Sequence, residues 1–234
     1  DITGGKMNDI MVPITTYPPY KWGSRTNERL PAIMAGMDLN SADKVIAISG
    51  SADFPFSALE FAGDVTGVDN DESQILRNNW RKKCLEDGNF DDFSSYWLRD
   101  MYDGAIKYNH PYFHGNRQRL ETIRAKLEHI EFIHADILQF EGLDAFTKVY
   151  LSNICGFTLP SKSKPKSKRD AYNCLIDFTQ KLSRGTLIYA SDGDRLNPPR
   201  ARVFGFRGLR VETELTAKAR ESEYLWTPTV FRRL

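Results

Sequence analysis

The sequence predicts an α/β fold with a mostly parallel, seven-stranded sheet, helices on both faces and a C-terminal antiparallel hairpin. Short, continuous apolar runs recur along the chain, and such runs are typical of parallel strands that are buried on both faces. Amphipathic segments of helical period lie between several of these runs. The last two strand segments alternate between apolar and polar residues, which favours an antiparallel pair at one edge of the sheet.

The first two strands are expected at 45–48 and 65–68, joined by a tight turn and a short helix. The turn, residues 49–53, consists of small residues, so a ligand could lie on its backbone amides. Asp69 follows the second strand, 19 residues after Gly50. At about this spacing an acidic residue meets the ribose hydroxyls of a bound nucleoside. The sequence therefore predicts a nucleoside site here, and the alternative is an ordinary strand–turn–helix connection.

The segment before the first strand is loosely patterned. Residues 1–40 predict an N-terminal arm that packs on the domain or closes over a ligand as a lid. Its stretch 15–23 is rich in proline and aromatic residues, which can stack on a purine or enclose a cation. A short helix is expected at 29–37. The main domain is predicted to extend over 41–234.

The remaining elements follow from the same patterns. Helices are expected at 72–85, 118–130 and 170–182, and further strands at 131–134, 148–152, 186–190, 209–216 and 223–232. Residues 90–119 are rich in aromatic side chains and histidine, and we predict an insertion that lines a substrate cleft.

Polar side chains follow the third, fourth and fifth strands. They are Asp136, Asn153 and Asp192. Ligands collect at the carboxyl ends of parallel strands, so these side chains should lie on the same edge of the sheet as Gly50 and Asp69. A base could come from Asp53, Asn153 or Asp192, and we predict Asn153 and Asp53 as the catalytic residues. Each of the three could instead cap the end of a strand.

Composition excludes several classes of protein. The chain has 234 residues, 41% hydrophobic and 27% charged, with a formal net charge of +1. This charge does not indicate bulk binding to nucleic acid, which stays an alternative partner but not the favoured one. The three cysteines are too scattered for a disulfide framework or a zinc cluster, so we predict a reducing, cytoplasmic location and no metal site. No run approaches the ~18 apolar residues of a transmembrane helix, and none is expected.

The segment 161–169 is the one low-complexity stretch, with basic residues and no acidic one. It follows the fourth strand, close to where a substrate would enter. It is either a solvated loop or a clamp, formed mainly by residues 162–169, on an anionic partner such as a phosphorylated small molecule.

Five strand–helix steps with a terminal antiparallel pair resemble the Rossmann-like fold of class I S-adenosylmethionine-dependent methyltransferases. The resemblance implies S-adenosylmethionine as cofactor and methyl transfer to a small or anionic acceptor. It also implies that the turn passes under the methionine part, Asp69 holds the ribose, Asp136 lies near the adenine and 153–157 line the reaction cleft. The turn departs from the family, in which an acidic-Gly-x-Gly-x-Gly run is commoner. The predicted cofactor-binding residues are Ser49, Gly50, Ser51, Asp69, Asn70, Gln74, Asp136, Ile137 and Asn153.

A narrower likeness concerns residues 68–74, which resemble the betaine-lipid synthase group through Gln74. That group has the same fold but moves the 3-amino-3-carboxypropyl group and releases methylthioadenosine. Two further alternatives are a nucleotide-dependent oxidoreductase and a non-catalytic nucleotide-binding protein. The missing glycines and the terminal pair count against the oxidoreductase.

Overall fold

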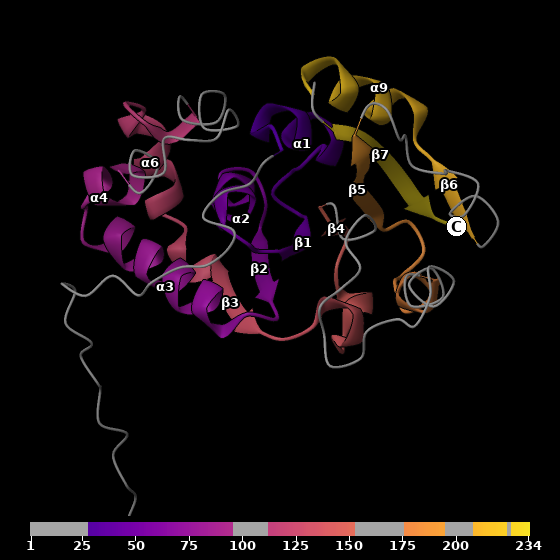
Figure 1. Cartoon of the computed structure of the whole chain (residues 1–234), viewed down its shortest axis with the longest axis horizontal. Coiled ribbons are helices and arrows are strands. Elements are labelled where there is room, and N and C mark those ends of the chain that lie inside the picture. The colour runs from indigo at the N-terminus through magenta and orange to yellow at the C-terminus, as the bar shows by residue number, and fades with distance from the viewer. Residues whose placement is uncertain (1–27, 96–111, 153–175, 195–207, 224–225) are drawn as a thin grey trace, which may run out of the picture.

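The computed structural model describes residues 28–95, 112–152, 176–194, 208–223 and 226–234. These residues form a seven-stranded sheet in the order β3-β2-β1-β4-β5-β7-β6 (Figure 1). The first five strands pair in parallel, and β7 is antiparallel to β5 and β6. The strands are β1 Lys44–Ile48, β2 Asp64–Asp69, β3 Ile130–His134, β4 Lys148–Tyr150, β5 Leu187–Asp194, β6 Leu209–Val211 and β7 Trp226–Arg233. The predicted fold class is confirmed.

Helices cover both faces of the sheet. They are α1 Leu30–Met37, α2 Asp53–Leu59, α3 Glu72–Glu86, α4 Phe90–Ser95, α6 Arg117–Arg124 and α9 Thr213–Ser222, with short 3₁₀ turns η1 Leu127–His129, η2 Ile137–Gln139 and η3 Leu143–Ala145. One buried cluster joins side chains of all six α-helices to one face. A second joins η2, η3 and the helical segment 176–180 to the other. None of the described helices has both the length and the apolarity that crossing a lipid bilayer requires.

β1 shows why a central strand of the sheet is largely apolar. Val45 and Ala47 belong to the first cluster and Ile46 to the second, and all three are fully buried. Successive side chains of a strand point to opposite faces, so a strand that is covered on both faces must be apolar at every position. Burying one such Val or Ile side chain contributes roughly 1.5–3 kcal/mol.

α1 packs against α9, α2 and β5, and a side chain of β4 is bonded to the end of the helix. Leu30, Ile33 and Met37 are fully buried in the first cluster. The ammonium group of Lys148, the first residue of β4, donates to the backbone oxygens of Met37 and Asp38 at 2.8 and 2.9 Å. Burial lowers the pKa of Lys148, and the neighbouring Asp43 partly offsets that effect. α1 therefore belongs to the core, and the division into a 1–40 arm and a 41–234 domain stays a prediction because residues 1–27 lie outside the described ranges.

Two predicted strand boundaries are wrong. The strand predicted at 209–216 ends at Val211, and helix α9 lies between β6 and β7, so the terminal pair is not a tight hairpin. Leu215 and Ala219 pack against the first cluster and are four residues apart, which is a helical spacing. In a short segment this spacing can be mistaken for the alternation of a strand. The fifth strand was predicted to end at Ala190, but it continues to Asp194 because β7 offers a partner as far as Trp226. Asp192 therefore lies within β5 rather than beyond its end.

Candidate functional site

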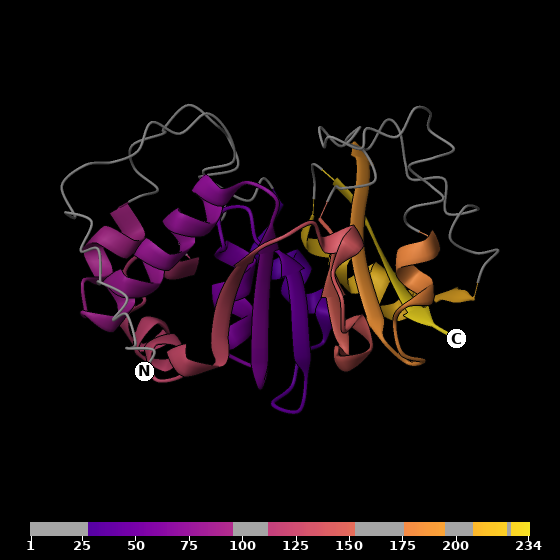
Figure 2. The same cartoon turned by 90° about the horizontal axis from the view of Figure 1, so that it is seen from below.

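The site begins at the turn between β1 and α2, at the upper edge of the sheet in Figure 2, where the parallel strands end. Gly50 and Ala52 both adopt the left-handed conformation, with φ of 44° and 62°. This conformation suits Gly50 but costs an alanine about 1–2 kcal/mol. A Cβ atom added at Gly50 would meet nothing within 4 Å, so the backbone of this residue borders open space. The turn is therefore strained and open on one side.

Asp69 is tied to this turn, as the spacing of the two residues predicts. Its Oδ2 accepts a hydrogen bond from the Gly50 amide at 2.9 Å, and its Oδ1 accepts one from the Asp71 amide at 3.0 Å. Burial raises the pKa of Asp69, while these two amides and the charge of Arg77 lower it. Each carboxylate oxygen has a further lone pair, so Asp69 can still accept hydrogen bonds from a diol.

Helix α3 supports the turn through two buried side chains. Arg81 Nη1 lies 2.8 Å from Asp53 Oδ1 and also donates to the Ser51 backbone oxygen. Asn78 Nδ2 donates to Ser49 Oγ and to the Gly50 backbone oxygen, both at 3.1 Å. The turn is thus fastened to α3 at four points along 49–53.

Aromatic rings enclose the Arg81 guanidinium. It lies 4.4 Å from the centroid of Phe93 and 5.3 Å from that of Phe56. Arg81 and Asp53 are 0% and 1% exposed at their side chains. Sequence reasoning missed Arg81 and Asn78, because polar residues on a helix usually face solvent. The apolar stripe of α3 offered no signal that its polar side also faces the protein.

The predicted role of Asp53 as a base stays a prediction. Besides Arg81, its carboxylate accepts a hydrogen bond from Ser51 Oγ at 2.5 Å. These contacts are those of a group that holds the turn together. The second predicted catalytic residue, Asn153, lies outside the described residues, as do Cys155 and the basic segment 161–169. Asn153 directly follows Ser152, the last described residue after β4.

The other predicted cofactor-binding residues lie along the same edge. Asp136 follows β3 and accepts a hydrogen bond from the Leu138 amide at 3.0 Å, while Ile137 is buried in the second cluster. Asn70 is exposed, and its backbone oxygen lies 3.1 Å from His134 Nε2. Gln74 is 5% exposed in the first turns of α3. The predicted positions 49–51, 69, 70, 74, 136 and 137 are thus gathered around the ends of β1, β2 and β3.

Sequence reasoning also missed Glu28, which lies at the other side of this edge. Its Oε1 accepts a hydrogen bond from Ser152 Oγ at 2.5 Å, beyond the end of β4. Burial raises the pKa of Glu28 to about 7, although the hydroxyls of Ser152, Ser191 and Tyr150 partly offset that rise. Glu28 belongs to a loosely patterned segment, so the sequence contains no sign of its burial.

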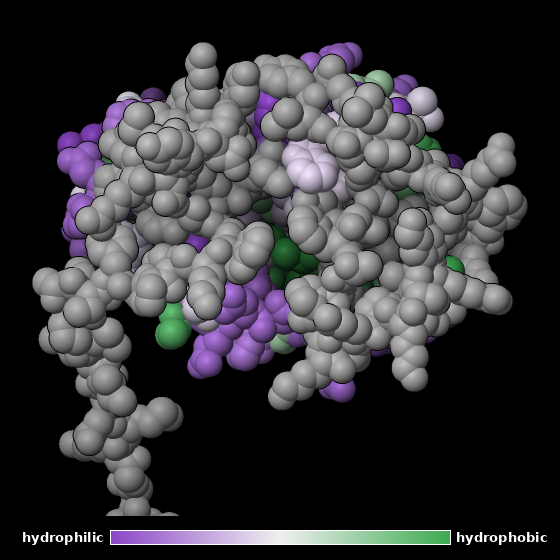
Figure 3. All heavy atoms as spheres, viewed as in Figure 1, coloured by the Kyte–Doolittle hydropathy of each residue, from purple (hydrophilic) through white to green (hydrophobic). Residues whose placement is uncertain are grey.

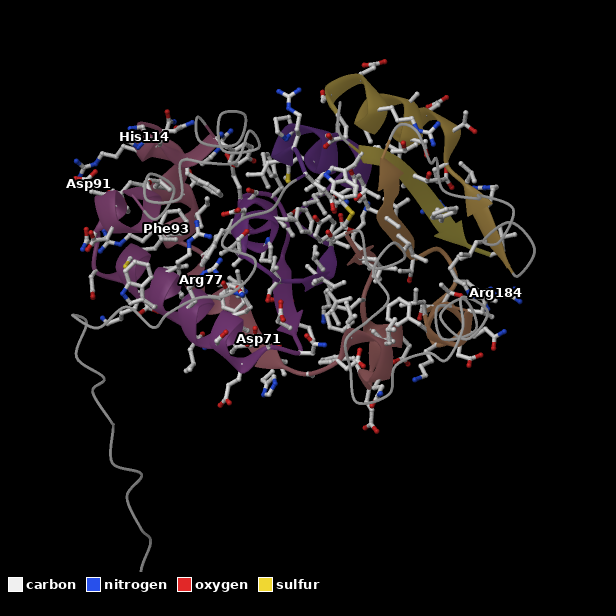
Figure 4. The ribbon with its side chains drawn as sticks, in the orientation of Figure 1. Asp71, Arg77, Asp91, Phe93, His114 and Arg184 are labelled. Atoms are coloured by element: carbon white, nitrogen blue, oxygen red, sulfur yellow. The ribbon has the colours of Figure 1, made fainter. Side chains whose placement is uncertain are left out.

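Figure 3 views this edge of the molecule and shows an apolar patch near β1 and β2, beside hydrophilic surface. In Figure 4, Asp71, Arg77 and Phe93 follow one another along α3 and α4, whereas Asp91 and His114 lie at the outer end. A cavity of about 260 Å³ is lined by Asp91 and His114 among other residues, and neither Gly50 nor Asp69 lines it. Within the described ranges, no three His, Cys, Asp or Glu side chains gather closely enough to hold a metal ion.

No protein-family model matches the chain, and no curated protein sequence is similar to it. Solved structures do match. The [4+2]-cyclase SpnF is 6% identical with a TM-score of 0.52, over 87% of this chain and 79% of SpnF. DhpI, solved in complex with SAH, is 11% identical with a TM-score of 0.50, over 88% of this chain and 82% of DhpI. N-methyltransferase NodS from Bradyrhizobium japonicum, in complex with S-adenosyl-L-homocysteine (SAH), is 10% identical with a TM-score of 0.49, over 86% and 83% of the two chains.

At these identities the similarity concerns the fold. The matches to SpnF and DhpI extend over most of this chain, including the central sheet. The strand order, the open turn after β1 and the acid at the end of β2 fit the resemblance that the sequence shows. The chain therefore has a Rossmann-like α/β fold, which SpnF and DhpI share.

Proposed function

We propose that this protein binds S-adenosylmethionine and transfers its methyl group to a small or anionic acceptor. The contact between Asp69 and the Gly50 amide carries the proposal. It brings a carboxylate with free lone pairs next to an open backbone turn, at the edge of the sheet where ligands of this fold collect. A ribose diol matches the carboxylate, and the extended amino-acid part of the cofactor matches the space over Gly50.

The other residues have matching roles. Ser49, Gly50 and Ser51 lie beneath the amino-acid part, and Asp136 with Ile137 flanks the adenine. Asn70 and Gln74 flank the ribose, and Asn153 lines the transfer side of the cleft. Bound S-adenosylmethionine supplies a methyl group that its sulfonium already activates. The protein therefore needs mainly to align the acceptor with that methyl group and to exclude water.

The test has two stages. Calorimetric titration with S-adenosylmethionine, S-adenosylhomocysteine, methylthioadenosine and NAD should show binding of the first three and not of NAD. No heat with any adenosyl compound would contradict the proposal. Incubation with S-adenosylmethionine and a panel of acceptors then identifies the product. S-adenosylhomocysteine indicates methyl transfer, methylthioadenosine indicates aminocarboxypropyl transfer, and binding without either product indicates a non-catalytic protein.

The product assay matters because SpnF, which shares the fold, is a [4+2]-cyclase. The fold accommodates other chemistry, so binding alone does not establish methyl transfer.

Asp69→Ala is expected to weaken binding of S-adenosylhomocysteine by about 1–3 kcal/mol, because charge-assisted hydrogen bonds to the ribose are lost. Asp69→Asn keeps one oxygen acceptor and should lose less. Asp64→Ala, at the exposed opposite end of β2, serves as the control and should bind like the wild type. A dissociation constant that Asp69→Ala leaves unchanged contradicts the ribose role.

The proposal also covers the partner and the location of the protein. The basic segment 161–169 would contact an anionic acceptor, because it follows the strand whose end borders the transfer side. The protein would act in the cytoplasm, since its cysteines are few and Cys84 is a free, buried thiol.

A further inference from the structure

Buried polar groups gather at the end of β4 and beside the first half of β5. The central one is Glu28, which is fully buried and bonded to Ser152 Oγ. The titratable groups that face it come from β4, from β5 and from the residue after α9; they are Tyr150, Tyr189 and Glu223. Glu223 is held in place by the backbone amides of Arg29 and Trp226, at 2.8 and 3.4 Å.

One hydroxyl of this cluster lacks a partner. Tyr189 is 0% exposed, and its hydroxyl makes no hydrogen bond with any residue in the described ranges. Burial raises the pKa of Tyr189, and the negative charge of Glu28 raises it further. A buried hydroxyl without a partner is rare in folded proteins and costs about 1–3 kcal/mol. The cluster therefore offers a polar group that a bound molecule could complete.

The cluster also has the right place for the transfer step. β1 lies between β2 and β4, so Asp69 and Ser152 stand on either side of the Gly50 turn. Ser152 has a φ of 51°, a left-handed conformation that serine rarely adopts. Such strain persists where the surrounding structure imposes it and gathers at functional sites. Ser152 is partly exposed, whereas Glu28 is fully buried behind it.

We propose that Glu28, acting through the Ser152 hydroxyl, accepts the proton that a hydroxyl or amine acceptor loses during transfer. This inference rests on the proposed function. The acceptor atom forms a bond to the methyl carbon with its own electron pair, and the carbon–sulfur bond breaks with its pair left on sulfur. The acceptor proton passes to Ser152 Oγ while the serine proton passes to Glu28 Oε1, and Glu28 later releases a proton to solvent.

Charge explains why the proton would move at this step. The sulfonium of S-adenosylmethionine is positive, and an opposite charge within about 4–6 Å lowers the pKa of a carboxyl by 1–3 units. S-adenosylhomocysteine is neutral at sulfur. Glu28 should thus be ionised before transfer, and its pKa should rise when the methyl group has left. The inference also specifies the acceptor class as a hydroxyl or an amine, since an acceptor without a proton to lose would need no proton-accepting carboxylate.

The test compares the two cofactor forms by calorimetry at about pH 5.5 and about pH 8.5, on either side of the Glu28 pKa of about 7. In the wild type, the affinity for S-adenosylmethionine relative to S-adenosylhomocysteine should increase about tenfold over this range, beyond any change seen in Glu28→Gln. The cofactor's own groups titrate in the same way with both proteins, so comparison with Glu28→Gln cancels their contribution to the affinity ratio. Glu60→Gln is the matched control, because this carboxylate pairs with Arg119 outside the cluster, and it should behave like the wild type.

Ser152→Ala keeps the carboxyl and removes one hydrogen bond that lowers its pKa. The pH at which the affinity ratio changes should therefore move upward. If both compounds bind but the ratio follows the same course in the wild type and in Glu28→Gln, the inference is wrong and the proposed function stands. If neither compound binds the wild type, the proposed function fails, and the inference fails with it.

Discussion

Arg81→Met is expected to lower the free energy of unfolding by about 3–5 kcal/mol, the usual effect of removing one partner of a buried ion pair. The substitution removes the Arg81 charge from the buried Asp53 carboxylate, and it removes the bond to the Ser51 backbone. Urea unfolding measures the loss. The affinity for S-adenosylhomocysteine should fall as well, because the turn loses its support from α3.

Arg119→Met is the matched control for this experiment. Arg119 also pairs with a carboxylate, Glu60 at 2.9 Å, and stacks on Tyr112 at 4.0 Å. Its side chain is 25% exposed, so water remains available to both groups and the loss should stay near or below about 1 kcal/mol. A double substitution of Arg81 and Asp53 should cost less than the sum of the two single ones. Equal losses for Arg81→Met and Arg119→Met would show that burial of the Arg81 pair is unimportant.

Glu28→Gln is expected to stabilise the protein at alkaline pH and to have little effect at acid pH. The pKa of Glu28 in the folded protein is about 7, above its ordinary value of 4.5. The favourable contribution of the neutral carboxyl is therefore fully present below pH 4.5 and is lost as the pH rises through 7. Because one pKa unit corresponds to about 1.36 kcal/mol, this rise in the pKa of Glu28 corresponds to about 3 kcal/mol in the free energy of unfolding.

Urea unfolding of the wild type and Glu28→Gln over this pH range measures that difference. The two stability curves should meet at the acid end and separate between about pH 4.5 and 7, with the variant the more stable, and the difference should be constant above pH 7. Glu141→Gln, at an exposed position, controls for the loss of one charge. Parallel curves for the wild type and Glu28→Gln would mean that Glu28 is not buried as a neutral group.

Much of the sheet could be predicted because its strands are covered on both faces. β1 is apolar from Val45 to Ile48 and β2 is buried from Val65 to Val68, and a pattern of that kind is visible without knowing the partners of each strand. The approach of Asp69 to Gly50 could be predicted for a similar reason, since both residues end neighbouring parallel strands. The spacing of apolar residues did not reveal helix α9, because most of its ten residues are polar and few apolar positions remain to show a helical period.

The interior polar groups could not be predicted, because contacts between distant parts of the chain determine them. Glu28 and Ser152 are 124 residues apart, and Arg81 and Asp53 are 28 apart. Nothing near Arg81 in the sequence distinguishes it from Lys82 and Lys83, which point to water at least in part. Burial of a charge depends on the partner that the fold supplies, and a single sequence does not show that partner.

The attachment of α1 to β4 has a mechanical consequence. The helix is eight residues long, about 12 Å. Met37, its last residue, is bonded to Lys148 at the start of β4, and Glu28, two residues before the helix, is bonded to Ser152, two residues after β4. The helix and strand thus form a closed frame, braced at both corners. Any displacement of β4 by an incoming molecule would carry the carboxyl group with it, so the spacing between this carboxyl and the strand's end is preserved while the surroundings shift.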